Sequence, residues 1–227
     1  MNSENILKKL ASMRNPENAL GMARFGINPE NALGIPVSQL RKMAREIGKN
    51  HATAQQLWAS KIHEARILAS MIDNPQDVDE RQMDAWAADF DSWDVCDQVC
   101  NNLFKKTLHA RAKAVEWSSR PEEYVKRAAF TLMACLAVGN KKAPDREFEQ
   151  FLPLIRAAAT DERNYVKKAV NWTLRQIGKR NTNLNKKAIA TANKIARISS
   201  KSARWIAKDA LRELNSAGVK KRFKQKR

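Results

Sequence analysis

The sequence YVKRAA at residues 124–129 recurs as YVKKAV at 165–170 and as WIAKDA at 205–210. The three copies align without gaps, and their first residues lie 41 and 40 positions apart. A period of about 40 residues with two helices per unit is typical of HEAT and armadillo-type repeats. Chance similarity between amphipathic helices is the weaker explanation, because three copies keep almost the same spacing. We therefore predict an all-α, HEAT/armadillo-like helical-repeat solenoid whose stacked units form a concave face.

The repeat extends less clearly toward the N-terminus. Trp93 lies 31 residues before Tyr124, and His63 lies another 30 residues before Trp93. The sequence NPENALG occurs at 15–21 and again at 28–34, and in each copy an asparagine precedes a proline at an expected first helical position. We expect both copies to be turn-then-helix starts. Amphipathic patterns predict further helices at residues 3–14, 37–49, 52–60, 63–73, 81–90 and 93–106.

Composition places the chain among globular helical proteins. Of its 227 residues, 43% are hydrophobic and 29% are charged, and there are only 7 Gly and 7 Pro. We expect a single HEAT-like repeat domain over residues 1–217 and a basic C-terminal tail at 218–227. No apolar run reaches the ~18–20 residues of a membrane-spanning helix. Three cysteines are too few for a disulfide framework, and without a C-x-x-C pattern we expect neither a metal nor another cofactor.

Charge is distributed unevenly along the chain. Residues 1–100 contain 11 Lys and Arg against 14 Asp and Glu, a net charge of −3. Residues 101–227 contain 31 against 10, a net charge of +21, and the two parts together give +18. Such a field favours a polyanionic partner, and nucleic acid above others, over a basic surface that serves only solubility.

The repeated segment carries cations at equivalent points of successive units. In a solenoid these points form a row along one wall, which we call the basic ladder, and such a row suits a concave basic cleft that follows a phosphate backbone. Its members are Lys126, Arg127, Lys167, Lys168 and Lys208. Trp172 follows Lys168 by four residues, so it lies on the same side of its helix and can add aromatic surface to the ladder. We assign the tryptophans at 58, 86, 117 and 205 to helix packing.

The stretch FDSWDVCDQVCNNLF at residues 90–104 contains the candidate catalytic group. Trp93 and Asp97 stand four residues apart, so they share one face of a helix. No lysine or arginine lies one turn away from Asp97 to neutralise it, although the protein is strongly basic. From spacing alone, a solvated acid beside a packed aromatic ring is the better explanation, and a catalytic role for Asp97 needs further support.

Several separated motifs resemble the AlkD-like family of DNA alkylation repair glycosylases, which are built from HEAT-like repeats. The motifs are S-W-D-x-x-D at residues 92–97, Y-V-K-R-A-A at 124–129 and K-K-A-x-x-W-x-L-R at 167–175. Each is weak alone, but their order and spacing are specific, and the likeness covers most of the chain. One departure is Phe25, where some members of the family carry a tyrosine after M-A-R, so any contact made by that hydroxyl is absent here.

The resemblance implies a metal-free, monofunctional glycosylase that releases cationic N3- and N7-alkylated purines, such as 3-methyladenine and 7-methylguanine, from duplex DNA. It implies that the damaged base is not flipped into a pocket. By the same resemblance, Asp97, Trp93 and Trp172 contact the deoxyribose of the lesion, and Arg127 contacts a phosphate. We expect such a protein to act as a cytoplasmic, nucleoid-associated monomer.

Two other functions fit parts of the sequence. A non-catalytic HEAT-repeat module that binds nucleic acid uses the same basic ladder but needs neither Asp97 nor Trp172. A protein-interaction scaffold needs an exposed apolar ridge. The high positive charge of residues 101–227 argues against such a ridge, so the scaffold is the weakest of the three alternatives.

Overall fold

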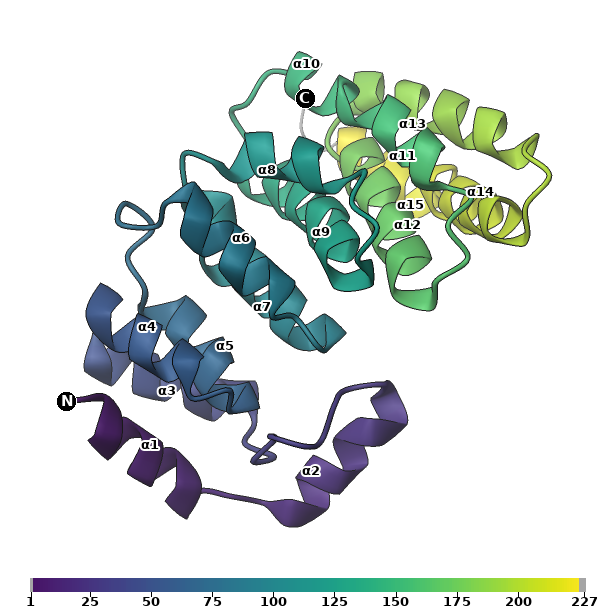
Figure 1. Cartoon of the computed structure of the whole chain (residues 1–227). Coiled ribbons are helices and arrows are strands. Elements are labelled where there is room, and N and C mark those ends of the chain that lie inside the picture. Colours follow the sequence, from purple (N-terminus) through teal and green to yellow (C-terminus); the bar gives the residue numbers. More distant parts are fainter. Residues whose placement is uncertain (1, 225–227) are drawn as a thin grey trace. The chain divides into compact units, whose positions relative to one another are not determined.

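A computed structural model describes residues 2–224, and within this part of the chain it contains helices, turns and bends but no strand. The residues form two compact units, one ending at Ala110 and the other beginning at Arg111 (Figure 1). The first unit contains α1 (Ser3–Ser12), α2 (Pro16–Met22), η1 (Ala23–Phe25), α3 (Val37–Ile47), α4 (His51–Ala59), α5 (His63–Ile72), α6 (Glu80–Ala88), α7 (Trp93–Asn102) and η2 (Phe104–Lys106). The second contains α8 (Ala110–Trp117), α9 (Glu123–Gly139), α10 (Arg146–Glu149), α11 (Phe151–Ala158), α12 (Asn164–Gly178), α13 (Thr182–Ala196), α14 (Lys201–Leu214) and α15 (Ala217–Lys224).

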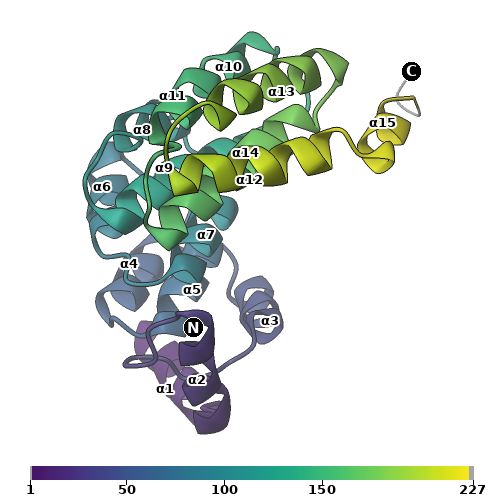
Figure 2. The same cartoon turned by 90° about the vertical axis from the view of Figure 1, so that its right-hand side faces the viewer.

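The second unit places the three copies of the repeated segment on α9, α12 and α14. These helices pack side by side as one layer, and α11 and α13 form a second layer against them (Figure 2). The aromatic residue that opens the first copy stacks on the one that opens the second, with the ring centroids of Tyr124 and Tyr165 5.7 Å apart. The hydroxyl of Thr173 donates to the carbonyl of Phe130 across the same two helices, at 2.5 Å. The predicted all-helical repeat is therefore confirmed.

The two copies of NPENALG do not fold alike, and the prediction of two helix starts is wrong for the second. The first copy forms α2, capped by the side chain of Asn15, whereas residues 28–34 form turns. The backbone N–H groups of Leu33, Gly34 and Ile35 donate to the carboxylate of Glu64 at 2.7, 2.7 and 3.2 Å. The buried carboxylate of Glu64 thus accepts hydrogen bonds from backbone N–H groups that would otherwise bond within a helix. Pro36 adds to the effect, because proline disfavours helical backbone at the residue before it.

Aromatic side chains fill the core of each unit. The rings of Trp58 and Trp86 stack with centroids 4.0 Å apart, and Trp117 is 1% exposed, as the sequence predicts. The same prediction is wrong for Trp205, whose side chain is 42% exposed on α14. The reason is its position in the repeat, because it opens the last copy of the segment, and no later copy within the described residues covers its ring.

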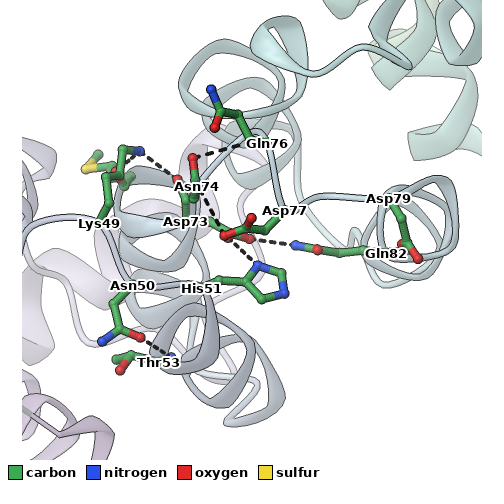
Figure 3. A network of polar contacts seen from close by, with 11 residues as sticks. Lys49, Asn50, His51, Thr53, Asp73, Asn74, Gln76, Asp77, Asp79 and Gln82 are labelled. Atoms are coloured by element: carbon green, nitrogen blue, oxygen red, sulfur yellow. Dashed lines mark hydrogen bonds and ion pairs between the residues drawn. The ribbon is translucent and has the colours of Figure 1, made fainter.

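A buried carboxylate at the end of α5 joins this helix to α4 and α6 in the first unit (Figure 3). Asp73, which is fully buried, lies 2.7 Å from Nδ1 of His51 and accepts a hydrogen bond from Gln82 at 2.6 Å. Lys49 donates to the backbone carbonyls of Met71 and Asp73 at the C-terminal end of α5. This network fixes the end of α5 that is opposite to the candidate site.

The basic segment at the C-terminus is partly helical. The sequence predicts a tail from residue 218 onward, but α15 covers Ala217–Lys224, where Ala217 and a run of lysine and arginine residues favour a helix. The last part of the predicted tail, 225–227, lies outside the described residues. The single repeat domain predicted over 1–217 stays a prediction.

Candidate nucleic-acid interface and catalytic site

The first two turns of α7 carry two of the three predicted catalytic residues, Trp93 and Asp97. Ser92 is its N-cap and is fully buried, which fixes where the helix begins. Trp93 and Asp97 follow one turn apart, and both side chains are half-buried, so each keeps an accessible face. The indole Nε1 of Trp93 donates to the backbone carbonyl of Phe25 at 2.9 Å. The ring of Phe25 is 72% exposed beside this bond.

A second pair of residues holds the same end of α7. Nε2 of His63, at the start of α5, lies 2.9 Å from a carboxylate oxygen of Asp94. Burial of His63 lowers its pKa, but the hydrogen bond and charge of Asp94, with the nearby charges of Glu64 and Asp91, outweigh this effect and raise the pKa above its ordinary value of 6.5. Residue spacing alone does not reveal this pair, because its members lie 31 positions apart. The available signal was the near-repeat that places His63 and Trp93 at equivalent points of two units.

A cavity of about 400 Å³ opens within the first unit, beside the start of α5 and α7. Apolar side chains of α2, η1 and the following loop form most of its wall. Glu17, Glu64 and Asp94 are its acidic lining residues. Because like charges repel, this cavity disfavours a phosphate group, and any phosphate contact belongs with the basic residues of the second unit.

Two members of the basic ladder are engaged within the protein. The ammonium group of Lys126 pairs with Asp161 at 3.0 Å, and its side chain is 18% exposed. Arg127 is 6% exposed and donates to the backbone carbonyl of Tyr165 at 2.7 Å. Both residues join α9 to the next repeat, so their structural role is visible, whereas their contact with phosphate stays a prediction.

Asp161, which sequence analysis missed, is the partner of two cations. Hydrogen bonds from Arg163 lower its pKa, and those from Lys126 add to the effect, so that despite the opposing effect of burial the pKa falls from 3.8 to about 2. The side chain of Asp161 is only 9% exposed. The signal for it in the sequence is its position four residues before Tyr165, at the turn that precedes a copy of the repeated segment.

The other members of the basic ladder lie closer to solvent. Lys168 on α12 and Lys208 on α14 are exposed and form no ion pair within the described residues. The ammonium group of Lys167 lies 5.8 Å from the ring centroid of Trp205, a cation–π arrangement that joins α12 to α14. Trp172 is half-buried on α12. These positions combine exposed cations with aromatic surface, which is the combination that nucleic-acid binding requires.

The predicted site residues therefore fall into two groups. Trp93 and Asp97 share α7 in the first unit, and Trp172 shares the layer of α9, α12 and α14 with the basic ladder in the second. The concave basic cleft stays a prediction. Within residues 2–224, no group of three or more His, Cys, Asp or Glu side chains is arranged to hold a metal ion. No helix in the same span is long and apolar enough to cross a membrane.

The fold and the arrangement of these helices define an all-helical HEAT-like repeat protein. A solved structure described as "a new family of proteins related to the HEAT-like repeat DNA glycosylases with affinity for branched DNA structures" matches it with a TM-score of 0.75. The two chains are 18% identical, and the match covers 93% of this chain and 95% of the other. At this identity the match shows the fold alone.

Residues 6–214 match the model of the family "DNA alkylation repair enzyme", and the chain belongs to that family. No curated protein matches the chain. An engineered protein of solved structure is 16% identical with a TM-score of 0.43, covering 78% of this chain and 91% of its own. A designed armadillo repeat protein is 18% identical with a TM-score of 0.39, covering 78% and 92%.

Proposed function

We propose that this protein is a monofunctional DNA glycosylase that removes cationic N3- and N7-alkylated purines, such as 3-methyladenine and 7-methylguanine, from duplex DNA by hydrolysing the N-glycosidic bond. The observation that carries the proposal is the position of Trp93 and Asp97 at the start of α7, one turn apart and both half-buried, in a chain of the alkylation repair family. Asp97 is the catalytic carboxylate of the proposal, and Trp93 and Trp172 are its aromatic residues.

The chemistry of the lesion explains why so few groups suffice. An alkylated purine already carries a positive charge, so its departure as a neutral base needs no general acid. As the bond between C1′ and the base nitrogen stretches, positive charge moves to the sugar. A fixed carboxylate stabilises that charge more in the transition state than in the ground state. The same carboxylate can orient the water that attacks C1′.

The aromatic residues and the cations have separate roles in this mechanism. The faces of Trp93 and Trp172 stabilise the sugar cation by a cation–π effect of about 0.5–2 kcal/mol each. Lys168 and Lys208 are exposed and bind backbone phosphates without reading sequence, and Lys167, Lys126 and Arg127 support the same surface. The base stays out of a protein pocket, so the enzyme selects lesions by how easily the base departs.

Replacement of Asp97 by asparagine tests the proposal. We expect Asp97→Asn to reduce the single-turnover release of 7-methylguanine from methylated duplex DNA by about 10²-fold or more, because the amide keeps the shape but not the charge. Asp77→Asn is the matched control, since Asp77 is an exposed acid of the same unit. No release by the wild type, or equal rates for wild type and Asp97→Asn, contradicts the proposal.

A second function has one observation in its favour. The solved structure with a TM-score of 0.75 belongs to proteins described as having affinity for branched DNA structures. A binding protein of that kind uses the basic ladder without Asp97. It predicts binding to branched DNA that falls with salt, is unchanged in Asp97→Asn, and is accompanied by no abasic sites.

A further inference from the structure

Three side-chain bonds hold the start of α7 against the preceding part of the first unit. Trp93 donates through its indole to the carbonyl of Phe25 at 2.9 Å. Asn28 donates to Asp91 at 3.2 Å. His63 lies 2.9 Å from Asp94, and of the three bonds it is the most deeply buried, with side-chain exposures of 4% and 17%.

The first turn of α7, like those of α3 and α5, has no side-chain cap, so tertiary bonds such as these help to hold it. Its N-cap, Ser92, makes no hydrogen bond from its side chain to the helix. By contrast, the side chains of Asn50 and Asp79 cap α4 and α6 in the same unit. A helix whose first turn is not capped locally takes its direction from tertiary contacts, and here the residues concerned are those beside Trp93 and Asp97.

The first turn of α5 is a suitable anchor for this purpose. His63 donates through its backbone N–H to the carbonyl of Asn31 at 3.0 Å. Its neighbour Glu64 accepts the amides of residues 33–35. The backbone at the start of α5 is therefore held by residues 31 and 33–35, and the imidazole reaches from this fixed backbone to Asp94.

We propose that His63 is a positioning residue, which acts through Asp94 to set the orientation of Trp93 and Asp97 at the start of α7. The part of this inference that concerns catalysis rests on the proposed function. His63 does not need to touch DNA. Its imidazolium and the carboxylate of Asp94 form an ion pair, and the neutral imidazole leaves only a hydrogen bond, so the hold on α7 weakens when the proton is lost.

The acidic groups that raise the pKa of His63 or line the cavity beside it act in one direction. They are Asp94 and Asp91 at the start of α7, Glu64 on its own helix and Glu17 of α2, which lines the same cavity. All are acidic and favour the imidazolium. Because the pKa in the folded protein is raised above 6.5, the stabilisation is complete below about 6.5 and is lost as the pH rises through the higher folded value.

NMR spectra of the six tryptophan indole N–H groups, recorded between pH 5.5 and 8.5, give the decisive test. The signal that is missing in Trp93→Phe identifies Trp93. We expect the Trp93 signal to shift with the same midpoint as the ring protons of His63 in the wild-type protein. The shift disappears in His63→Gln and persists in His51→Gln. His51 is a matched control, because it pairs with Asp73 at 2.7 Å in the same unit but at the opposite end of α5.

Excision of 7-methylguanine gives the second readout. We expect His63→Gln to lower kcat by about tenfold at pH 6, with the KM for DNA unchanged, because misplaced catalytic groups cost rate rather than binding. The wild-type rate falls as the pH rises through the His63 midpoint, and His63→Gln loses this dependence. The rate of His51→Gln keeps it.

The two readouts separate failure of this inference from failure of the proposed function. If the chemical shift of the Trp93 indole N–H in the wild type does not change at the pH midpoint of His63, the inference is overturned. This result needs no variant at His63, so a misfolded His63→Gln does not prevent a decision. Equal loss of the shift in His51→Gln also overturns it. Coupled Trp93 and His63 signals without base release support the positioning role and contradict the glycosylase.

Discussion

At Gly34 the backbone has φ +77°, in the left-handed region that disfavours residues with a Cβ atom. A Cβ there collides with the carbonyl oxygen of Asn15 and comes within 2.7 Å of the amide of Ala19. Gly34 also donates to Glu64 and accepts from Asn18. One glycine therefore lets the second copy of NPENALG pack against the first.

We predict that Gly34→Ala destabilises the protein by about 1–3 kcal/mol, since it adds strain and a steric clash with backbone atoms that cannot move freely. Urea unfolding monitored by circular dichroism measures the change. Gly21→Ala is the control, because Gly21 lies in α2 with nothing within 4 Å of an added Cβ. There we expect a gain of about 0.5–1 kcal/mol. A neutral Gly34→Ala contradicts the assigned role.

At the level of elements, side-chain bonds at the helix ends join consecutive repeats. Asp161 precedes α12 and binds Lys126 of α9, while Arg127 reaches the carbonyl of Tyr165. Farther along the same layer, Arg175 of α12 binds Glu213 of α14 at 2.6 Å. These contacts span 35 to 38 residues, so the repeat spacing in the sequence becomes a set of polar contacts between neighbouring helices.

Asp161→Asn tests the contribution of this joint. The pKa of Asp161 is lowered to about 2, so the ionised carboxylate stabilises the fold above its ordinary pKa of 3.8, and this stability is lost as the pH falls toward 2. We expect a loss of about 2 kcal/mol at pH 7. The difference between variant and wild type shrinks on acidification below pH 3.8. Thermal melts at several pH values measure this, and a difference that does not change with pH is the contrary result.

Across the whole molecule, the unequal charge distribution assigns the two units different tasks. Residues 111–227 contain 29 Lys and Arg against 10 Asp and Glu, a net charge of +19, whereas residues 1–110 contain 13 against 14, a net of −1. Under the proposed function, we expect non-specific affinity for DNA to depend on the second unit, whereas Asp97 belongs to a unit that is nearly neutral.

Salt dependence of binding tests this division. We expect the slope of log K against log salt for duplex DNA to decrease by about 0.9 for each of Lys168→Ala and Lys208→Ala, because each substitution removes one phosphate contact. Lys8→Ala is the control in the first unit, where Lys8 is exposed and pairs with Glu4. Fluorescence anisotropy at several salt concentrations gives the slopes. Equal slopes for all three variants and the wild type contradict the assignment.

The helical repeat could be predicted from local patterns, since the spacing of Tyr124, Tyr165 and Trp205 reflects a period that each unit must keep in order to stack. The sequence also placed Trp93 and Asp97 one turn apart, because position on a helix follows from spacing alone. Three other features follow from contacts between distant residues: the second NPENALG is not helical, Arg127 is buried, and His63 lies beside Asp94. These features depend on which distant group bonds to a given backbone amide or side chain in the folded protein. Local periodicity carries no information about such partners.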